Sequence, residues 1–377
     1  MISSNMKWKE VLEIKSGKNQ KDVVDINGRY PIYGSGGIIG YSKEYLCPAG
    51  TTIIGRKGTI NSPLYVNEPF WNVDTAFGLI PSQQLVSKYL YYFCCYFNFK
   101  ALDKSTTIPS LAKRDLENVE MPIPPLDEQS RIVARIEELF SELDKAVDTL
   151  KTTKEQLEVY RQAVMKDAFQ EKESIIRLGD AIEKPRYGTS KKCDYLCTAN
   201  STAVLRIPNI DTKNGRVDSS DLKYAEFNEK EFEQLSLKNG DILIIRSNGS
   251  ISLVGSSAII RKCDTDKTYA GYLMRLRILN KEKLLPKYLL YYLSSPDARR
   301  YIESVAKSTS GVNNINSQEI SKLCVPLSSI EKQEKTVAEI EMKLSVYHEI
   351  EKSVDTVLVQ ADAMRQSILK QAFEGKL

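Results

Sequence analysis

The C-terminal segment of this chain repeats a segment from its middle. Residues 333–377 align with residues 129–173 without a gap, at a constant separation of 204 positions, and 14 of the 45 aligned residues are identical. Unrelated segments of ordinary composition match at about one position in sixteen. The same register extends upstream, where Leu111 aligns with Ile315. A repeat of this length predicts a chain built from two similar halves.

Each half consists of a variable unit followed by a shared unit. The sequence predicts a first variable unit at 1–125, a shared helix at 126–173, a second variable unit at 174–325 and a second shared helix at 326–377. The variable units carry net charges of +3 and +7, whereas the shared units carry −4 and −2. Basic domains are candidates for contact with a polyanion, so binding is expected in the variable units.

The shared units are predicted to be long paired helices. Neither contains Gly or Pro in its interior, and apolar residues recur at alternating spacings of three and four, which is typical of a helix that buries one face against another helix. In the second unit the expected seam includes Ile350, Val357 and Met364. Two antiparallel helices of about 45 residues, roughly 70 Å long, related by a pseudo-twofold internal repeat, are the expected arrangement. A helical dimerisation arm is the simpler alternative.

The variable units are predicted to be mixed α/β domains, which makes the whole chain an α+β protein. Short segments rich in Ile, Val, Tyr and Thr alternate with glycine turns, as in YPIYGSGGIIGY at 30–41, GTTIIGRKGTI at 50–60 and NGDILIIRSNGS at 239–250. Both units then turn helical, at KYLYYF (88–93) and KYLLYY (287–292).

Several stretches are similar to enzyme motifs without matching them. GSGGIIG at 34–40 lacks the spacing of a dinucleotide loop, and GTTIIGRKGT at 50–59 has Arg56 where a P-loop requires lysine. NEPF at 67–70 is close to the motif that holds adenine in amino-methyltransferases, but Glu68 replaces its first proline. We expect no catalytic residue in this chain.

Metal sites and targeting segments are not expected either. His348 is the only histidine, which excludes triads and histidine-rich metal sites, and the pair Cys193 and Cys197 has no second cysteine pair to complete a zinc site. Seven cysteines, two of them adjacent, suit a reducing compartment. Without an apolar leader or a run of eighteen apolar residues, we expect a cytoplasmic protein outside the membrane.

The remaining chemistry is binding. Glycine lets a backbone approach a ligand closely, while Arg hydrogen-bonds guanine edges and Asn hydrogen-bonds adenine edges in the major groove of DNA. The polar residues of the glycine-rich segments are therefore the candidate DNA-binding residues: Tyr33, Ser35, Arg56, Lys57, Thr59, Arg206, Asn209, Arg246, Ser247, Asn248 and Ser250.

With these features in place, the chain resembles the specificity subunit of Type I restriction–modification systems over essentially its whole length. The resemblance is carried by PIPPLDEQSRIVARIEELF at 122–140, by RQAVMKDAF at 161–169 and by their second copies. It implies that each variable unit is a target-recognition domain that reads one half of a split site on double-stranded DNA. It also implies that the helices set the spacing and dock two modification methyltransferase subunits and, through them, restriction subunits.

The resemblance further implies that S-adenosylmethionine, ATP and Mg belong to those partner subunits and that this chain holds no cofactor. The alternative is a helical scaffold that bridges two protein partners without reading DNA. The basic charge of the variable units favours the DNA-binding hypothesis.

Overall fold

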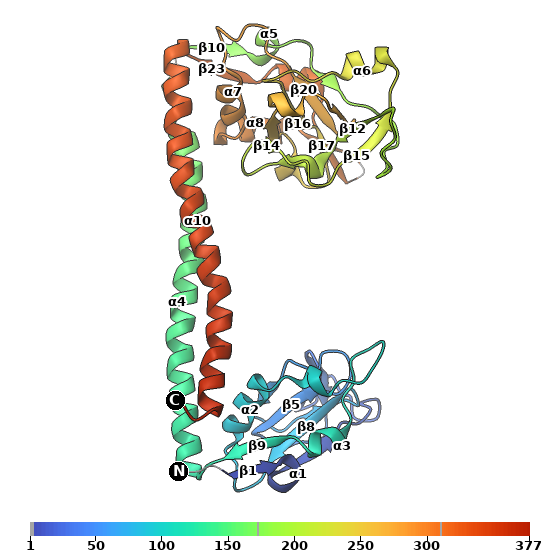
Figure 1. Ribbon diagram of the computed structural model, residues 1–377, viewed down its shortest axis with the longest axis vertical. Coiled ribbons are helices and arrows are strands. Elements are labelled where there is room, and N and C mark those ends of the chain that lie inside the picture. Colours follow the sequence, from blue (N-terminus) through green and yellow to red (C-terminus); the bar gives the residue numbers. More distant parts are fainter. Residues whose placement is uncertain (1–3, 172, 310) are drawn as a thin grey trace. The chain divides into compact units, whose positions relative to one another are not determined.

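A computed structural model describes residues 4–171, 173–309 and 311–377 (Figure 1). The chain divides into two compact units, one formed by Met1–Thr152 with Val354–Leu377 and the other by Thr153–Ser353. We call these units 1 and 2, and the β-rich part of each is its head. Each unit also contains part of both long helices, α4 (Leu126–Asp167) and α10 (Ile330–Phe373). The predicted α+β fold with two β-rich domains and two long antiparallel helices is confirmed.

The long helices form because nothing within them interrupts the backbone ladder. The 42 residues of α4 and the 44 of α10 include neither Gly nor Pro, and α4 begins directly after Pro125. Beyond α10, Gly375 adopts a φ of 71°, the left-handed conformation that commonly follows a helix end. In the described part of the chain, no helix combines the length and apolar character needed to cross a membrane.

The predicted seam of α10 is wrong by one residue at three positions, while Val354 and Ala361 of the predicted seam are buried. Ile350, Val357 and Met364 are 41%, 44% and 54% exposed. Burial follows a different row of α10, which keeps the three-and-four spacing: Val337, Ile340, Leu344, Tyr347, Glu351, Val354, Leu358, Ala361, Arg365 and Ile368. This row includes the polar residues Glu351 and Arg365, so apolar periodicity alone could not identify it.

Head 1 contains a four-stranded sheet in the order β2-β8-β5-β6 and a three-stranded sheet in the order β4-β3-β7. Its elements are β1 (Ser4–Lys7), α1 (Trp8–Val11), β2 (Leu12–Ser16), β3 (Tyr30–Gly34), β4 (Gly37–Ser42), β5 (Thr51–Gly55), β6 (Leu64–Val66), β7 (Trp71–Asn72), β8 (Ala76–Pro81), α2 (Ser87–Tyr96), α3 (Lys113–Glu117) and β9 (Glu120–Ile123). The buried strand β5 lies between β8 and β6, and both pairings are antiparallel.

Head 2 has corresponding sheets in the orders β11-β20-β16-β18 and β15-β12-β19. Its strands and helices are β10 (Ser174–Arg177), α5 (Leu178–Ala181), β11 (Arg186–Tyr187), β12 (Ser201–Leu205), β13 (Ile210–Asp211), β14 (Arg216–Val217), β15 (Lys223–Glu226), α6 (Glu229–Leu235), β16 (Ile242–Ile245), β17 (Ser247–Asn248), β18 (Ser257–Ile259), β19 (Thr268–Tyr269), β20 (Leu273–Leu276), α7 (Pro286–Leu293), α8 (Pro296–Val305), β21 (Lys307–Thr309), β22 (Val312–Asn314), α9 (Ser317–Ser321) and β23 (Cys324–Leu327).

The two heads therefore share one topology although their sequences do not align by eye. Strand β5 corresponds to β16 at the centre of the larger sheet, and β3 pairs with β7 in parallel as β12 pairs with β19. The main difference is an insertion in head 2. A turn of two residues joins β3 to β4, whereas the segment between β12 and β15, residues 206–222, contains the extra hairpin β13–β14.

Each head is closed by both long helices. In unit 1, Leu369 and Ala372 near the end of α10 join the core cluster that contains Ile132 and Ile136 of α4. Phe373 packs its ring on Tyr89 of α2, with ring centroids 5.1 Å apart. In unit 2, Phe169 just beyond α4 packs in the same way on Tyr288 of α7, also at 5.1 Å. The start of one helix and the end of the other thus complete each core.

A buried glutamine connects each head to the helix that follows it. The side chain of Gln129 accepts a hydrogen bond from Val86 N (2.8 Å) and donates to Gln84 O (2.9 Å) and Pro124 O (2.8 Å). Gln333 makes the corresponding three bonds in unit 2. Both glutamine side chains are fully buried, and each bonds three backbone groups of its own unit.

Candidate nucleic-acid interface

An arginine follows the central strand of each head and occupies the same place in both. The Arg56 N–H donates to Thr75 O (2.8 Å), and the Arg246 N–H donates to Tyr272 O (2.9 Å). The carbonyl oxygen of each arginine accepts from the residue pair that the repeat already aligns, Leu111 N and Ile315 N, in both cases at 2.9 Å. Arg56 and Arg246 are therefore structural equivalents.

Their guanidinium groups are held in the same way. Nη1 of Arg56 donates to Asp74 O (3.4 Å), and Nη1 of Arg246 donates to Gly271 O (3.1 Å). Each group also lies over an aromatic ring, that of Phe77 at 5.7 Å and that of Tyr187 at 4.4 Å. An arginine restrained by a carbonyl and a ring is preorganised, and its remaining N–H groups can form the two-pronged contact that recognises guanine.

The loop after Arg56 presents the other predicted residues of head 1. Lys57 and Thr59 are exposed, and Gly58 between them has a φ of 79°. The loop is tight, because a Cβ added to Gly55 would lie 2.0 Å from Thr59 O. Glycine at position 55 is therefore required for this loop to fold back beside the strand.

Tyr33 lies near the end of β3, and Ser35 follows that strand. Val73 N donates to Tyr33 O (3.0 Å), which places the end of β3 next to the segment that holds Arg56. The Tyr33 ring is half-buried against Phe70 at 5.4 Å, and burial is the main cause that raises the pKa of Tyr33. Ser35 lies in the turn of the β3–β4 hairpin and is partly exposed. Tyr33 and Arg56 are thus bonded to one segment, at Val73 and Thr75, whereas no contact joins Ser35 to Arg56 among the described residues.

The loop after Arg246 is held by strand pairing and by hydrogen bonds within the loop. Ser247 is buried in β17, which pairs with β22. Asn248 Oδ1 accepts from Ser250 N (2.8 Å), and Ser250 Oγ lies 2.8 Å from Ser252 Oγ. The exposed part of this loop is therefore Gly249 and Ser250, with Asn248 half-buried behind them.

Arg206 and Asn209 lie at the start of the insertion of head 2. Their side chains differ in whether they are free to contact a ligand. Asn209 is 1% exposed, and its amide group accepts from Arg206 N and donates to Asp218 O and Asp221 O. The buried side chain uses its amide nitrogen for these two backbone bonds, so it is not available to donate to a base. Arg206 is paired with the Asp221 carboxylate (2.8 Å), while its Nε is buried and has no hydrogen-bond partner among the described residues.

Arg206 and Arg246, 40 residues apart, line one cavity of about 600 Å³, which we call the reading cleft. Its lining residues are Thr189, Ser190, Lys191, Cys193, Arg206, Ile207, Pro208, Lys223, Arg246, Ser247, Ala270, Gly271 and Tyr272. None of these lining residues is acidic, and the buried Nε atoms of both arginines are without a partner in the described structure. Sequence reasoning did not find Lys191, Lys223 or Tyr272, since only the fold brings these segments together.

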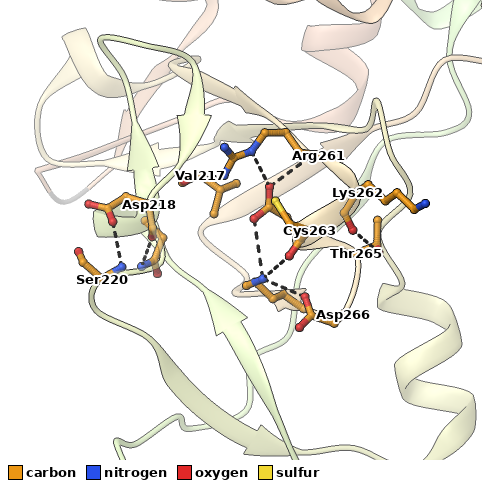
Figure 2. A network of polar contacts seen from close by, with 11 residues as sticks. Val217, Asp218, Ser220, Arg261, Lys262, Cys263, Thr265 and Asp266 are labelled. Carbon is orange, nitrogen blue, oxygen red and sulfur yellow. Dashed lines mark hydrogen bonds and ion pairs between the residues drawn. The ribbon is translucent and has the colours of Figure 1, made fainter.

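A polar network in head 2 surrounds the buried Asp264 (Figure 2). The buried carboxylate of Asp264 accepts from Arg261 Nε (3.1 Å) and lies 3.8 Å from Lys267 Nζ. Arg261 also donates to Val217 O of β14 (3.4 Å). The network ties the turn before β19 to the insertion, and β19 leads into Ala270, whose N–H donates to Leu205 O beside Arg206 (2.8 Å).

Comparisons with known proteins identify the family of this chain. The family model described as Type I restriction modification DNA specificity domain matches residues 3–159 and 172–352. The chain is 27% identical to the Type I restriction enzyme EcoKI specificity subunit of Escherichia coli K12, over 86% of this chain and 73% of that one. It is 23% identical to the MjaVIII specificity subunit of Methanocaldococcus jannaschii, over 82% and 75%.

The fold agrees as well. A chain solved in work on complex assembly and conformational transition of the type I R-M system superposes with a TM-score of 0.77 at 17% identity, covering 99% of this chain and 98% of that one. The HsdS subunit from Thermoanaerobacter tengcongensis gives a TM-score of 0.60 at 16% identity, covering 99% and 97%.

The family match decides between the two functions left open by the sequence. Specificity subunits bind the DNA recognition site within their complex, and they are not catalytic. Partner subunits carry out methylation and cleavage and use S-adenosylmethionine and ATP. The alternative of a scaffold that does not read DNA is therefore not supported. The chain belongs to the family of Type I restriction–modification specificity subunits.

Proposed function

We propose that each head reads one half of a bipartite, asymmetric site on double-stranded DNA through the loop that follows its central strand. The equivalence of Arg56 and Arg246 is the observation that supports this proposal. Both have the same backbone contacts, and both are held by a carbonyl and a ring. The residues that follow the two arginines differ. They are Lys57, Gly58 and Thr59 in head 1, and Ser247, Asn248 and Gly249 in head 2. Equivalent arginines in different surroundings suit two unlike half-sites.

The test is methylome sequencing of cells that carry the complex with Arg56→Ala or Arg246→Ala. Each change is expected to relax the methylated motif in one half only, because each removes about 1–3 kcal/mol of discrimination at one base. Arg300→Ala is the matched control, as Arg300 is an exposed arginine of α8 with an 80% exposed side chain. Uniform loss of methylation without a change of motif would instead make the arginine a phosphate contact and refute base reading.

We further propose that the long helices dock two modification methyltransferase subunits, which in turn carry restriction subunits. In unit 2, Met342, Val346 and Ile350 of α10 are spaced by four residues and are 63%, 52% and 41% exposed. This apolar row is not used in the α4–α10 seam. An exposed apolar row on a helix marks a protein contact.

Val346→Glu is expected to remove one modification subunit from the complex in native mass spectrometry. Val359→Glu, which adds the same charge at a 73% exposed valine on a different face of the same helix, serves as the control. Retention of both modification subunits by Val346→Glu would refute this docking site.

Mg, like S-adenosylmethionine and ATP, is proposed to act in the partner subunits, in the cytoplasm.

A further inference from the structure

The two arginines that the repeat aligns, Arg161 and Arg365, have different surroundings in the two units. In unit 1, Arg365 of α10 forms an ion pair with Asp144 of α4. Its guanidinium also lies 5.2 Å from the centre of the Phe140 ring. The arginine at this point of unit 1 is therefore neutralised by a carboxylate and covered by an aromatic ring.

Unit 2 lacks both of these partners. At the separation of 204 positions, His348 stands in place of Asp144 and Leu344 in place of Phe140. The Arg161 guanidinium donates a hydrogen bond to the Lys213 carbonyl oxygen (3.5 Å), and no ion pair of Arg161 is seen among the described residues. Arg161 thus keeps its positive charge without the carboxylate that its counterpart has.

The insertion of head 2 brings further positive charge to the same place. Its hairpin tip packs against α7, because a Cβ at Gly215 (φ 62°) would lie 3.0 Å from the Leu290 side chain. Lys213 beside it forms an ion pair with Glu351 of α10 (3.0 Å). Arg216 is exposed at the start of β14, and no ion pair of its side chain is recorded within the described residues.

These elements enclose a cavity of about 640 Å³, which we call the helix-side cleft. Its lining comes from α4, the hairpin, α7 and α10. Of the described lining residues, five are Lys or Arg (Arg161, Lys213, Arg216, Lys287 and Lys352) and two are Glu (Glu341 and Glu349). Glu341 is already paired with Lys287 (2.7 Å). Lys213 is likewise paired, with Glu351 (3.0 Å), so the excess of positive charge in the cleft rests mainly on Arg161 and Arg216, although the cleft borders helices that are acidic as a whole.

One segment connects this cleft to the DNA-reading region. Residues 206–208 of the insertion line the reading cleft with Arg246, and residues 212–216 line the helix-side cleft. Guanidinium groups are well suited to phosphate oxygens, and contacts to phosphates position a protein on a duplex without reading its sequence. We propose that the helix-side cleft binds backbone phosphates of the target duplex beside the half-site read by head 2. This inference rests on the proposed function of that head.

The test measures DNA affinity of the assembled complex at several salt concentrations. Arg161→Ala and Arg216→Ala are each expected to lower the slope of log K against log[salt] by about one, and to weaken specific and non-specific duplexes alike. The methylated motif is expected to stay unchanged. Arg365→Ala is the matched control, because Arg365 is the residue of unit 1 that aligns with Arg161 and its charge is already paired with Asp144. The complex with Arg365→Ala is expected to show the same salt slope as the unmodified complex.

A second pair of variants tests the charge itself. His348→Asp places a carboxylate where unit 1 has Asp144, so it should reproduce the effect of Arg161→Ala, whereas the neutral His348→Gln should have no effect. Circular dichroism checks that each variant is folded.

An unchanged slope in the Arg161 and Arg216 variants would overturn the proposal, as would an equal fall with Arg365→Ala. Loss of a modification subunit with the slope intact would also overturn it and indicate an acidic segment of that partner as the occupant. If Arg246→Ala fails to alter the motif while these slopes fall, base reading by head 2 is wrong and the phosphate site stands.

Discussion

Replacing Gln129 by alanine should destabilise unit 1 by about 3 kcal/mol. The side chain is fully buried and makes three hydrogen bonds, to Val86 N, Gln84 O and Pro124 O. Each such bond contributes about 1 kcal/mol net, and the alanine side chain can form none of the three. Alanine regains only a few tenths of a kcal/mol through its higher helix propensity.

Guanidinium denaturation followed by tryptophan fluorescence measures the free energy of unfolding of unit 1. Trp8 and Trp71 are the two tryptophans of the chain, and both are buried in head 1. The exposed Gln366→Ala, also in unit 1, should change the free energy of unfolding by less than about 0.5 kcal/mol. A loss below about 1 kcal/mol for Gln129→Ala would refute the reasoning that this glutamine satisfies otherwise unpaired backbone groups.

Three further outcomes are expected. Phe169→Ala should destabilise unit 2 by about 3–5 kcal/mol, because the ring is 3% exposed and packs on two tyrosines; circular dichroism in denaturant measures it, and a loss under about 1 kcal/mol would contradict the closure of this head by α4. Gly55→Ala should leave head 1 folded but push the loop at residues 56–59 out of its present conformation, because the added Cβ would clash with Thr59 O, and it should therefore reduce methylation of the specific site. Unchanged methylation kinetics would show that DNA recognition does not need this loop conformation. Burial raises the pKa of Cys47 to about 12 and the pKa of Cys94 well above its usual value, so both should stay protonated and resist iodoacetamide at pH 8 in the folded protein, where mass spectrometry should find alkylation at the exposed thiols, Cys197, Cys263 and Cys324. Rapid alkylation of Cys94 would contradict its burial.

The seam of α10 illustrates where a sequence pattern stops being sufficient. Its first half follows apolar residues, as at Ile340 and Tyr347, and was predicted correctly. Its second half places Glu351 and Arg365 on the buried row, because Lys213 and Asp144 supply opposite charges there. A periodicity search cannot find a buried charge, since burial of a charge depends on a partner elsewhere in the chain.

The repeat, the uninterrupted helices, the α+β class and the family followed from the sequence by itself, because these signals are local or lie at one constant separation along the chain. The tertiary structure alone showed that Arg56 and Arg246 are equivalent, that Arg206 and Arg246 share a cleft, and that Asn209 is committed to backbone groups. Those relations arise from hydrogen bonds between strands far apart in sequence, in heads whose side chains have diverged while the strand pairing has not. Spacing along the chain carries no information about such contacts, so only the folded structure decides them.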